Sequence, residues 1–290
     1  NFVPADRFPY TSAFGTAFDS GDFVRNMDDA MKLADVAGFG DRRVDAEARG
    51  RLRGLGMNCY IEATDGGPVW EEDVHVLFEG NGTVTVLIGT LATGQGHKTS
   101  YSQVLADSLG IPFEDINIVQ GDTDRIATGG GTAGSKSMML GSAALTHAAE
   151  KIIEKGKRIA AHMLEAAEAD IEFTDGAFSI IGTDRALTVI EVAVAARDKA
   201  NLPDGVEPGL DQKANSESAA GTYPNGCHIC EVEVDPDTGI VKVVNYSVVD
   251  DFGRVVNPLL LAGQVHGGIV QGLGQALMEA CVYDSASGQL

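Results

Sequence analysis

Hydrophobic residues recur at helical spacing in several stretches of the chain. Phe23, Met27 and Met31 follow one another at intervals of four residues, which predicts an amphipathic helix over Asp22–Phe39. The same periodicity, bounded by Gly and Pro, predicts the other helices. These are Gly96–Leu109, Ser135–Leu164, Leu187–Ala196 and Leu259–Val282.

Shorter apolar runs between turn residues predict strands. The runs Glu72–Glu79 and Thr83–Gly89 are joined across Asn81-Gly82, the dipeptide most typical of a tight hairpin. A polar stretch containing Pro and Gly, Asn201–Gly221, predicts a loop. Further strands are predicted at Leu55–Ala63, Ile116–Gln120, Ile171–Thr174, Ala177–Ile181, Gly226–Val234 and Ile240–Val249. This order of hairpins and helices, without clean strand–helix–strand repeats, predicts a mixed α+β fold.

Two turns rich in Gly, Ser and Thr precede predicted helices. The first begins at Gly89 and reads GTLATGQGHKTS; the second begins at Ala127 and reads ATGGGTAGSKS. Glycine lets a backbone approach a ligand closely, and a helix N-terminus offers unpaired N–H groups and a positive dipole end. The pair is typical of phosphate binding, although plain turn chemistry explains the same residues. Neither a P-loop nor a GxGxxG fingerprint fits, because His97 and Thr99 stand where those motifs need other residues.

The net charge of the chain argues against some classes of partner. The chain of 290 residues carries a net charge of −21, which argues against nucleic acid and anionic membrane surfaces as partners. An anionic ligand must then be held by local backbone donors. No apolar run approaches the roughly 20 residues that span a bilayer, and the N-terminal residues do not resemble a secretory signal.

The cysteines and His97 carry weaker signals. Four cysteines form no disulfide framework, so a reducing, cytoplasmic location is expected. Cys227 and Cys230 are spaced as in a CxxC motif, but they lie in a predicted strand, where such residues point to opposite faces. His97 alone is more typical of a capping or core-edge histidine than of a ligand or base. No nucleophile triad is visible, and the DPDTG turn at Asp235 lacks the Glu of a calcium loop.

Several motifs in order resemble one enzyme family. The first turn, the VQGDTD that follows it, the GTAGSKS turn and the late GQVHGGIVQGLGQAL are similar to the molybdenum-binding subunit of the xanthine dehydrogenase, aldehyde oxidase and carbon monoxide dehydrogenase family. The resemblance covers nearly the whole chain and continues in RGLGMNCYIEATDG and EVEVDPDTGIVKVVNYSVVDDFGRVVNP.

The resemblance implies a molybdopterin cofactor, in bacterial members usually the cytosine dinucleotide form. Gly94, Gln95, Gly96 and His97 match the family's first cofactor turn, and Gln264 matches a Gln that hydrogen-bonds the pterin. Lys136 stands where the family usually has Arg, which keeps the charge but loses the planar fork. The second cofactor turn is matched by Thr132, Gly134, Ser135, Lys136, Ser137 and Met138.

The resemblance also implies the reaction and its surroundings. The family hydroxylates an electron-poor carbon of an aldehyde, N-heterocycle or similar small molecule, with water as the oxygen source and a Glu as general base. We expect that Glu beyond Leu290, so no catalytic residue and no metal ligand is assigned here, and the isolated chain is expected to be inactive without cofactor. Residues Asn1–Gly67 correspond to the tail of the first molybdenum-binding domain and Pro68–Leu290 to most of the second.

Expected partners are iron–sulfur and flavin (FAD) subunits or domains, assembled as an oligomer of heteromeric units. The alternative from another class is a non-catalytic binding or scaffold protein that keeps the fold. A GxGE motif in the sequence beyond Leu290 would favour the enzyme.

Overall fold

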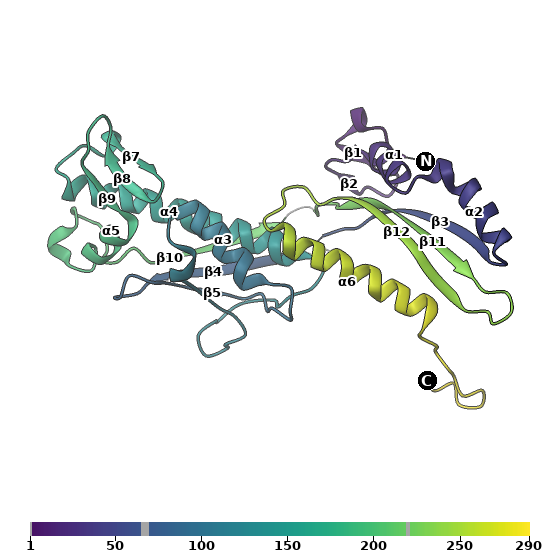
Figure 1. The fold of residues 1–290 in the computed structure, drawn as a ribbon. Coiled ribbons are helices and arrows are strands. Elements are labelled where there is room, and N and C mark those ends of the chain that lie inside the picture. Colours follow the sequence, from purple (N-terminus) through teal and green to yellow (C-terminus); the bar gives the residue numbers. More distant parts are fainter. Residues whose placement is uncertain (1, 65–69, 219–220) are drawn as a thin grey trace. The chain divides into compact units, whose positions relative to one another are not determined.

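The computed structural model describes residues 2–64, 70–218 and 221–290. The chain divides into two compact units (Figure 1). Unit 1 comprises Asn1–Ala63 and Thr222–Leu290, and unit 2 comprises Thr64–Gly221. The predicted boundary between Gly67 and Pro68 lies outside the described residues.

Unit 2 is built on a four-stranded sheet. Its strand order is β10 (Gln212–Ser218), β4 (Trp70–Phe78), β5 (Val84–Ile88) and β6 (Ile116–Val119). Strands β4 and β5 form the predicted hairpin, whereas β5 and β6 are parallel and are connected through helix α3 (His97–Leu109). This single strand–helix–strand crossover brings the turn after β5 to one end of the sheet.

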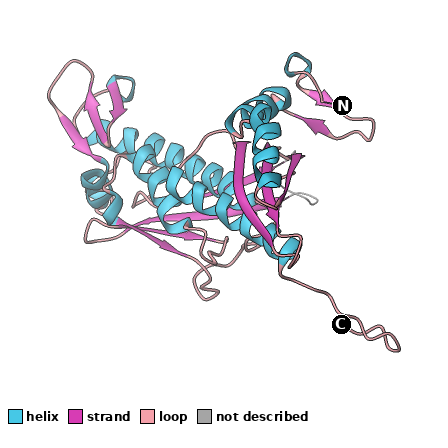
Figure 2. Cartoon of the chain, turned by 45° about the vertical axis from the view of Figure 1, so that its right-hand side comes forward, coloured by secondary structure: helices cyan, strands magenta, loops and turns pink. Residues whose placement is uncertain are grey.

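The core of unit 2 lies between this sheet and two helices. Helix α4 (Lys136–Met163) packs on β4 and β10 and against α3 (Figure 2). Strand β4 alternates strictly, so that Val74, Val76 and Phe78 are buried against the helices. Beyond the sheet, β7 (Ile171–Thr174), β8 (Ala177–Ile180), β9 (Ala186–Thr188) and α5 (Val189–Ala195) form a small antiparallel sheet with its own helix.

Unit 1 contains a three-stranded antiparallel sheet. Its order is β12 (Val241–Asp251), β11 (Asn225–Val234) and β3 (Leu52–Ile61), and helix α1 (Phe23–Leu33) packs on β11 and β12. Ala30 and Ala34 meet Cys227 and Ile229 in a small core. The unit also contains β1 (Tyr10–Thr11), β2 (Ala17–Phe18), α2 (Phe39–Ala48) and α6 (Pro258–Leu277). Short 3-10 helices in the two units span Ala5–Arg7, Val36–Gly38, Phe113–Asp115, Glu168–Asp170 and Lys199–Asn201.

Four predicted elements need correction. The helix predicted from Leu187 begins at Val189, because Ala186–Thr188 forms β9. The helix predicted over Asp22–Phe39 ends at Leu33, because Asp35 adopts a left-handed conformation (φ 47°) that breaks it into α1 and a 3-10 turn. The loop predicted over Asn201–Gly221 contains β10, whose polar residues suit an edge strand with only Ala214 and Ser216 turned inward. The last helix ends at Leu277 rather than Val282. No helix among the described residues is both long and apolar enough to cross a membrane.

Candidate functional site

The two glycine-rich turns meet in unit 2. The first turn (residues 89–96) leads from β5 into α3, and the second turn (residues 128–135) leads into α4. Gly89 and Gly129 lie back to back: a Cβ atom on Gly89 would stand 2.4 Å from the Cα of Gly129. Only glycine at both positions allows this approach, so the turns that the sequence placed 40 residues apart form one surface.

Side-chain hydrogen bonds tie the second turn to the first. The Leu91 N–H donates to Thr132 Oγ1 at 3.1 Å, and Thr132 Oγ1 lies 3.0 Å from Ser137 Oγ in the first turn of α4. Thr132 therefore links both turns to the start of a helix. This is a structural contact of a residue predicted to bind cofactor.

The N-termini of α3 and α4 lack the usual caps. The residues at their N-cap positions, Gly96 and Ser135, are left-handed (φ 80° and 57°), make no side-chain capping bond, and are followed by no acidic residue in the first helical turn. By contrast, α1, α5 and α6 are each capped by a side chain. In a chain of net charge −21, two helix starts free of acid favour an anionic ligand.

Open space borders one glycine of each turn. Gly94 (φ 116°) and Gly131 (φ 67°) have no atom within 4 Å of the position that a Cβ would occupy. Gln95 in the first turn is half-buried and Gly134 in the second is exposed and left-handed (φ 55°). The turns thus present backbone rather than bulky side chains to their surroundings.

His97 belongs to the support of the first turn. It is buried, its ring centroid lies 5.3 Å from that of Tyr101, and its Nδ1 lies 3.3 Å from Gln120 Nε2. Burial lowers the pKa of His97, so the ring is neutral at pH 7. Because the Gln120 amide N–H donates, Nδ1 accepts and the proton of the neutral ring is assigned to Nε2.

Sequence reasoning missed the residues behind the turns. The Tyr101 hydroxyl lies 2.9 Å from Thr90 Oγ1 and donates to the Ser137 carbonyl, also at 2.9 Å. The buried carboxylate of Glu72 accepts the Thr90 N–H at 2.9 Å. A signal for Glu72 was present, since it occupies an inward position of the alternating strand β4.

The remaining predicted residues lie as follows. Lys136 and Ser137 begin α4 and are buried, and Met138 is half-buried against the core of unit 2. Gln264 lies in unit 1, on helix α6, and is exposed. Helix α6 has no buried residue, although most of it is apolar.

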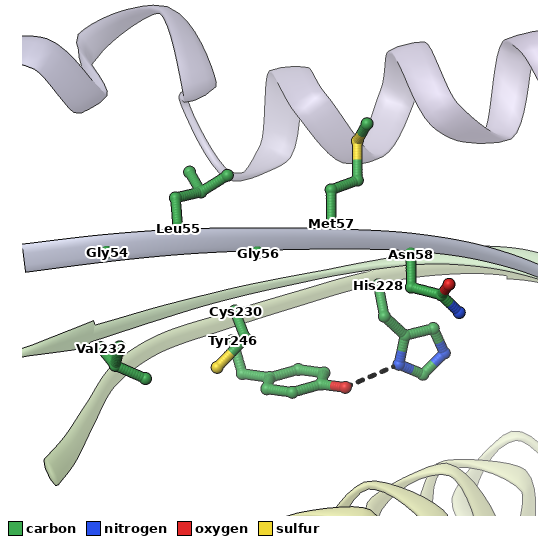
Figure 3. A pocket seen from close by; sticks show the side chains of 9 residues that line it. All are labelled: Gly54, Leu55, Gly56, Met57, Asn58, His228, Cys230, Val232 and Tyr246. Carbon is green, nitrogen blue, oxygen red and sulfur yellow. Dashed lines mark hydrogen bonds between the residues drawn. The ribbon is translucent and has the colours of Figure 1, made fainter.

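Unit 1 carries a groove on the face of its sheet that is turned away from α1. The groove has a volume of about 540 Å³; Gly54 and Gly56 leave it open, and the His228 Nδ1 lies 2.9 Å from the Tyr246 hydroxyl on its wall (Figure 3). Cys230 lines the groove while Cys227 is buried under α1, so the prediction that this pair points to opposite faces is confirmed. No cluster of His, Cys, Asp and Glu suited to a metal occurs among the described residues.

Comparison with known proteins identifies the family of the chain. A family model described as molybdopterin cofactor-binding domain matches residues 29–290. The nicotine 6-hydroxylase large subunit of Paenarthrobacter nicotinovorans is 36% identical over 96% of this chain and 36% of its own length. The carbon monoxide dehydrogenase large chain of Hydrogenophaga pseudoflava is 34% identical over 98% of this chain and 37% of its own.

Solved structures give the same result. Quinoline 2-oxidoreductase from Pseudomonas putida 86 matches 99% of this chain and 38% of its own, with a TM-score of 0.91 and 30% identity. A Cu,Mo-CO dehydrogenase matches 98% of this chain and 38% of its own, with a TM-score of 0.87 and 33% identity. The chain therefore spans little more than a third of the length of these relatives.

Proposed function

Since this chain belongs to the molybdopterin cofactor-binding domain family of the molybdenum hydroxylases, we propose that its two glycine-rich turns hold the cofactor in the molybdenum-binding subunit of such an enzyme. The observation that carries the proposal is the pair of uncapped, acid-free helix starts beside glycines that border open space. A polar, phosphate-bearing cofactor needs backbone donors of this kind. The cytosine dinucleotide form, with its pyrophosphate, would use donors from both turns.

Each turn contributes a defined part of the proposed site. Gly94, Gln95 and Gly96 present the first turn, with His97 fixed behind them. In the second, Thr132 holds the turn in place and Gly134 and Ser135 shape the entry to α4. Lys136, Ser137 and Met138 follow at the helix start. Gln264 on α6 is proposed, on the family resemblance alone, to hydrogen-bond the pterin.

The proposed reaction is the hydroxylation of an aldehyde, N-heterocycle or similar small substrate. When bound, the cofactor supplies the redox chemistry, with water as the oxygen source. The residues of this chain bind and orient it, and the base is proposed to come from outside these 290 residues. Because the chain spans just over a third of its relatives' length, we expect the 290 residues alone to hold no cofactor and to show no turnover.

The proposed partners carry electrons away. Relatives include a large subunit and the gamma subunit of a 6-hydroxypseudooxynicotine dehydrogenase complex, which supports a heteromeric assembly with iron–sulfur and flavin components. A cytoplasmic location is proposed because all four cysteines are free.

Isotope labelling tests the proposed reaction. The natural protein that carries this sequence, purified with its subunits, is assayed on a panel of aldehydes and N-heterocycles in H₂¹⁸O with a dye as electron acceptor. We expect ¹⁸O in the hydroxylated product of at least one substrate. A protein that contains molybdenum but incorporates no label would contradict the reaction, and one with neither metal nor turnover would favour the scaffold alternative.

A further inference from the structure

A carboxylate is buried directly beneath the first turn. Strand β4 turns Glu72, Val74 and Val76 toward the core, and Glu72 has an exposed fraction of 0%. A charged group in an apolar core is costly unless it is hydrogen-bonded and paired. The contacts of Glu72 therefore indicate what it stabilises.

Glu72 holds the end of β5. Its Oε1 accepts the Thr90 N–H at 2.9 Å, and the neighbouring Gly89 N–H opposes the rise in the pKa of the Glu72 carboxyl. A Cβ atom on Gly89 would lie 2.9 Å from Oε1, so the carboxylate is in close contact with the backbone there. One side chain therefore hydrogen-bonds Thr90 and packs against Gly89, at the point where the first turn begins.

Lys136 brings the second turn into the same cluster. It is the first residue of α4, its exposed fraction is 2%, and its charge interacts with that of Glu72. A Cβ atom on Gly130 would stand 2.7 Å from the Lys136 ammonium, which therefore lies against the backbone of the second turn. The Glu72 carboxylate beneath the first turn is therefore within electrostatic range of the Lys136 ammonium beneath the second.

We propose that Glu72 is a positioning residue for the cofactor, which sets the two turns in register through the Gly89 and Thr90 amides on one side and Lys136 on the other. This inference rests on the proposed function.

The other carboxylate oxygen supports a role beyond packing. Glu72 Oε2 is buried and has no hydrogen-bond partner among the described residues. Burial raises the pKa of Glu72, and the Thr90 N–H, the Lys136 charge and the Gly89 N–H oppose that rise. Asp73 and Tyr101 are the other titratable groups whose interaction with Glu72 is resolved. Burying a carboxylate with one unpartnered oxygen costs free energy, and such a group beside a proposed binding turn is typical of functional sites.

The test compares three variants of the natural protein with its subunits. Glu72→Ala removes the acceptor and the charge, Glu72→Gln keeps an acceptor oxygen and removes the charge, and Glu71→Gln makes the same charge change at the exposed neighbour on β4. Molybdenum per chain, the visible circular dichroism of the bound cofactor and the Tm are measured for each.

We expect about a tenfold or greater loss of molybdenum in Glu72→Ala and a several-fold loss in Glu72→Gln, since hydrogen bonds to charged groups are the stronger ones. The dichroism per molybdenum changes in Glu72→Gln while its Tm stays near the wild-type value, and Glu71→Gln matches wild type throughout. If Glu72→Ala does not fold, the molybdenum content and dichroism of Glu72→Gln alone test the inference. Wild-type cofactor content and dichroism in Glu72→Gln would overturn the inference, whereas a wild-type protein without molybdenum would overturn the proposed function itself.

Discussion

A buried carboxylate, Glu231, holds two arginines in unit 1. Glu231 on β11 has an exposed fraction of 1% and lies between two arginines: Arg53 Nη2 donates to its Oε2 at 2.6 Å, and Arg42 binds its Oε1. Arg42 comes from α2 and Arg53 from β3. One carboxylate therefore joins a helix to the sheet of unit 1.

Glu231→Gln is expected to lower the free energy of unfolding by roughly 2 kcal/mol, because it removes the charged hydrogen bonds of Arg42 and Arg53 to a buried carboxylate. The two arginines keep their second partners, Asp35 and Glu233. Glu47→Gln, which breaks the exposed pair with Arg43, is expected to cost less than about 1 kcal/mol. Urea denaturation of both variants measures the difference. Equal effects would mean that burial of Glu231 contributes nothing.

The stabilisation that Glu231 provides is expected to depend on pH. Burial alone would raise the pKa of Glu231, but hydrogen bonds from Arg42 and Arg53 outweigh it and hold the pKa below its usual value. The stabilisation is therefore present above the ordinary Glu pKa of about 4.3 and is lost as the pH falls through the depressed pKa of the folded state. The difference in free energy of unfolding between wild type and Glu231→Gln should therefore become smaller as the pH is lowered.

At the scale of elements, periodicity predicted most of the fold. Helices α3 and α4 and the hairpins β4–β5, β7–β8 and β11–β12 lie within a few residues of their predicted bounds. Strand β10 was missed because its residues are polar and its place is set by pairing with β4, far away in the sequence. The turns of the site were found from sequence because glycine is tied to local geometry. Their supports, Glu72 and Tyr101, depend on tertiary packing.

Helices α3 and α4 cross where a glycine meets an aromatic ring. A Cβ atom on Gly141 of α4 would lie 2.6 Å from the hydroxyl of the buried Tyr101. That hydroxyl bonds Thr90 at the start of the first turn and the Ser137 carbonyl. Packing of the two helices is thereby coupled to the geometry of the site.

Gly141→Ala is expected to destabilise unit 2 by about 1–3 kcal/mol, although alanine is the better helix former, because the buried ring must move. Gly40→Ala in α2 is the control: no atom lies within 4 Å of its Cβ position, so it should be stabilising by up to about 1 kcal/mol. Thermal unfolding monitored by circular dichroism distinguishes them. A neutral Gly141→Ala would show that the ring can move freely.

At the scale of the whole molecule, the two units are not simple consecutive segments. Unit 1 closes only when β3 pairs with β11, whose residues lie more than 150 positions later in the chain, as in the pair Cys59 and Cys227. No local pattern predicts such a pairing. The family resemblance implied a cofactor-binding function for the turns, but it did not imply this division into units. The function of the turns and the predicted domain boundaries both stay predictions.

Cofactor content tests the role of the two turns most directly. The natural protein that carries this sequence and its Gly129→Val variant are analysed for molybdenum and, after acid hydrolysis, for cytidine monophosphate. We expect stoichiometric amounts of both in the wild type and a loss of about tenfold or more in the variant, since a side chain at Gly129 forces it away from Gly89. Wild-type levels of both in a folded Gly129→Val variant, or a wild-type protein with neither, would contradict the assignment of the turns to the cofactor.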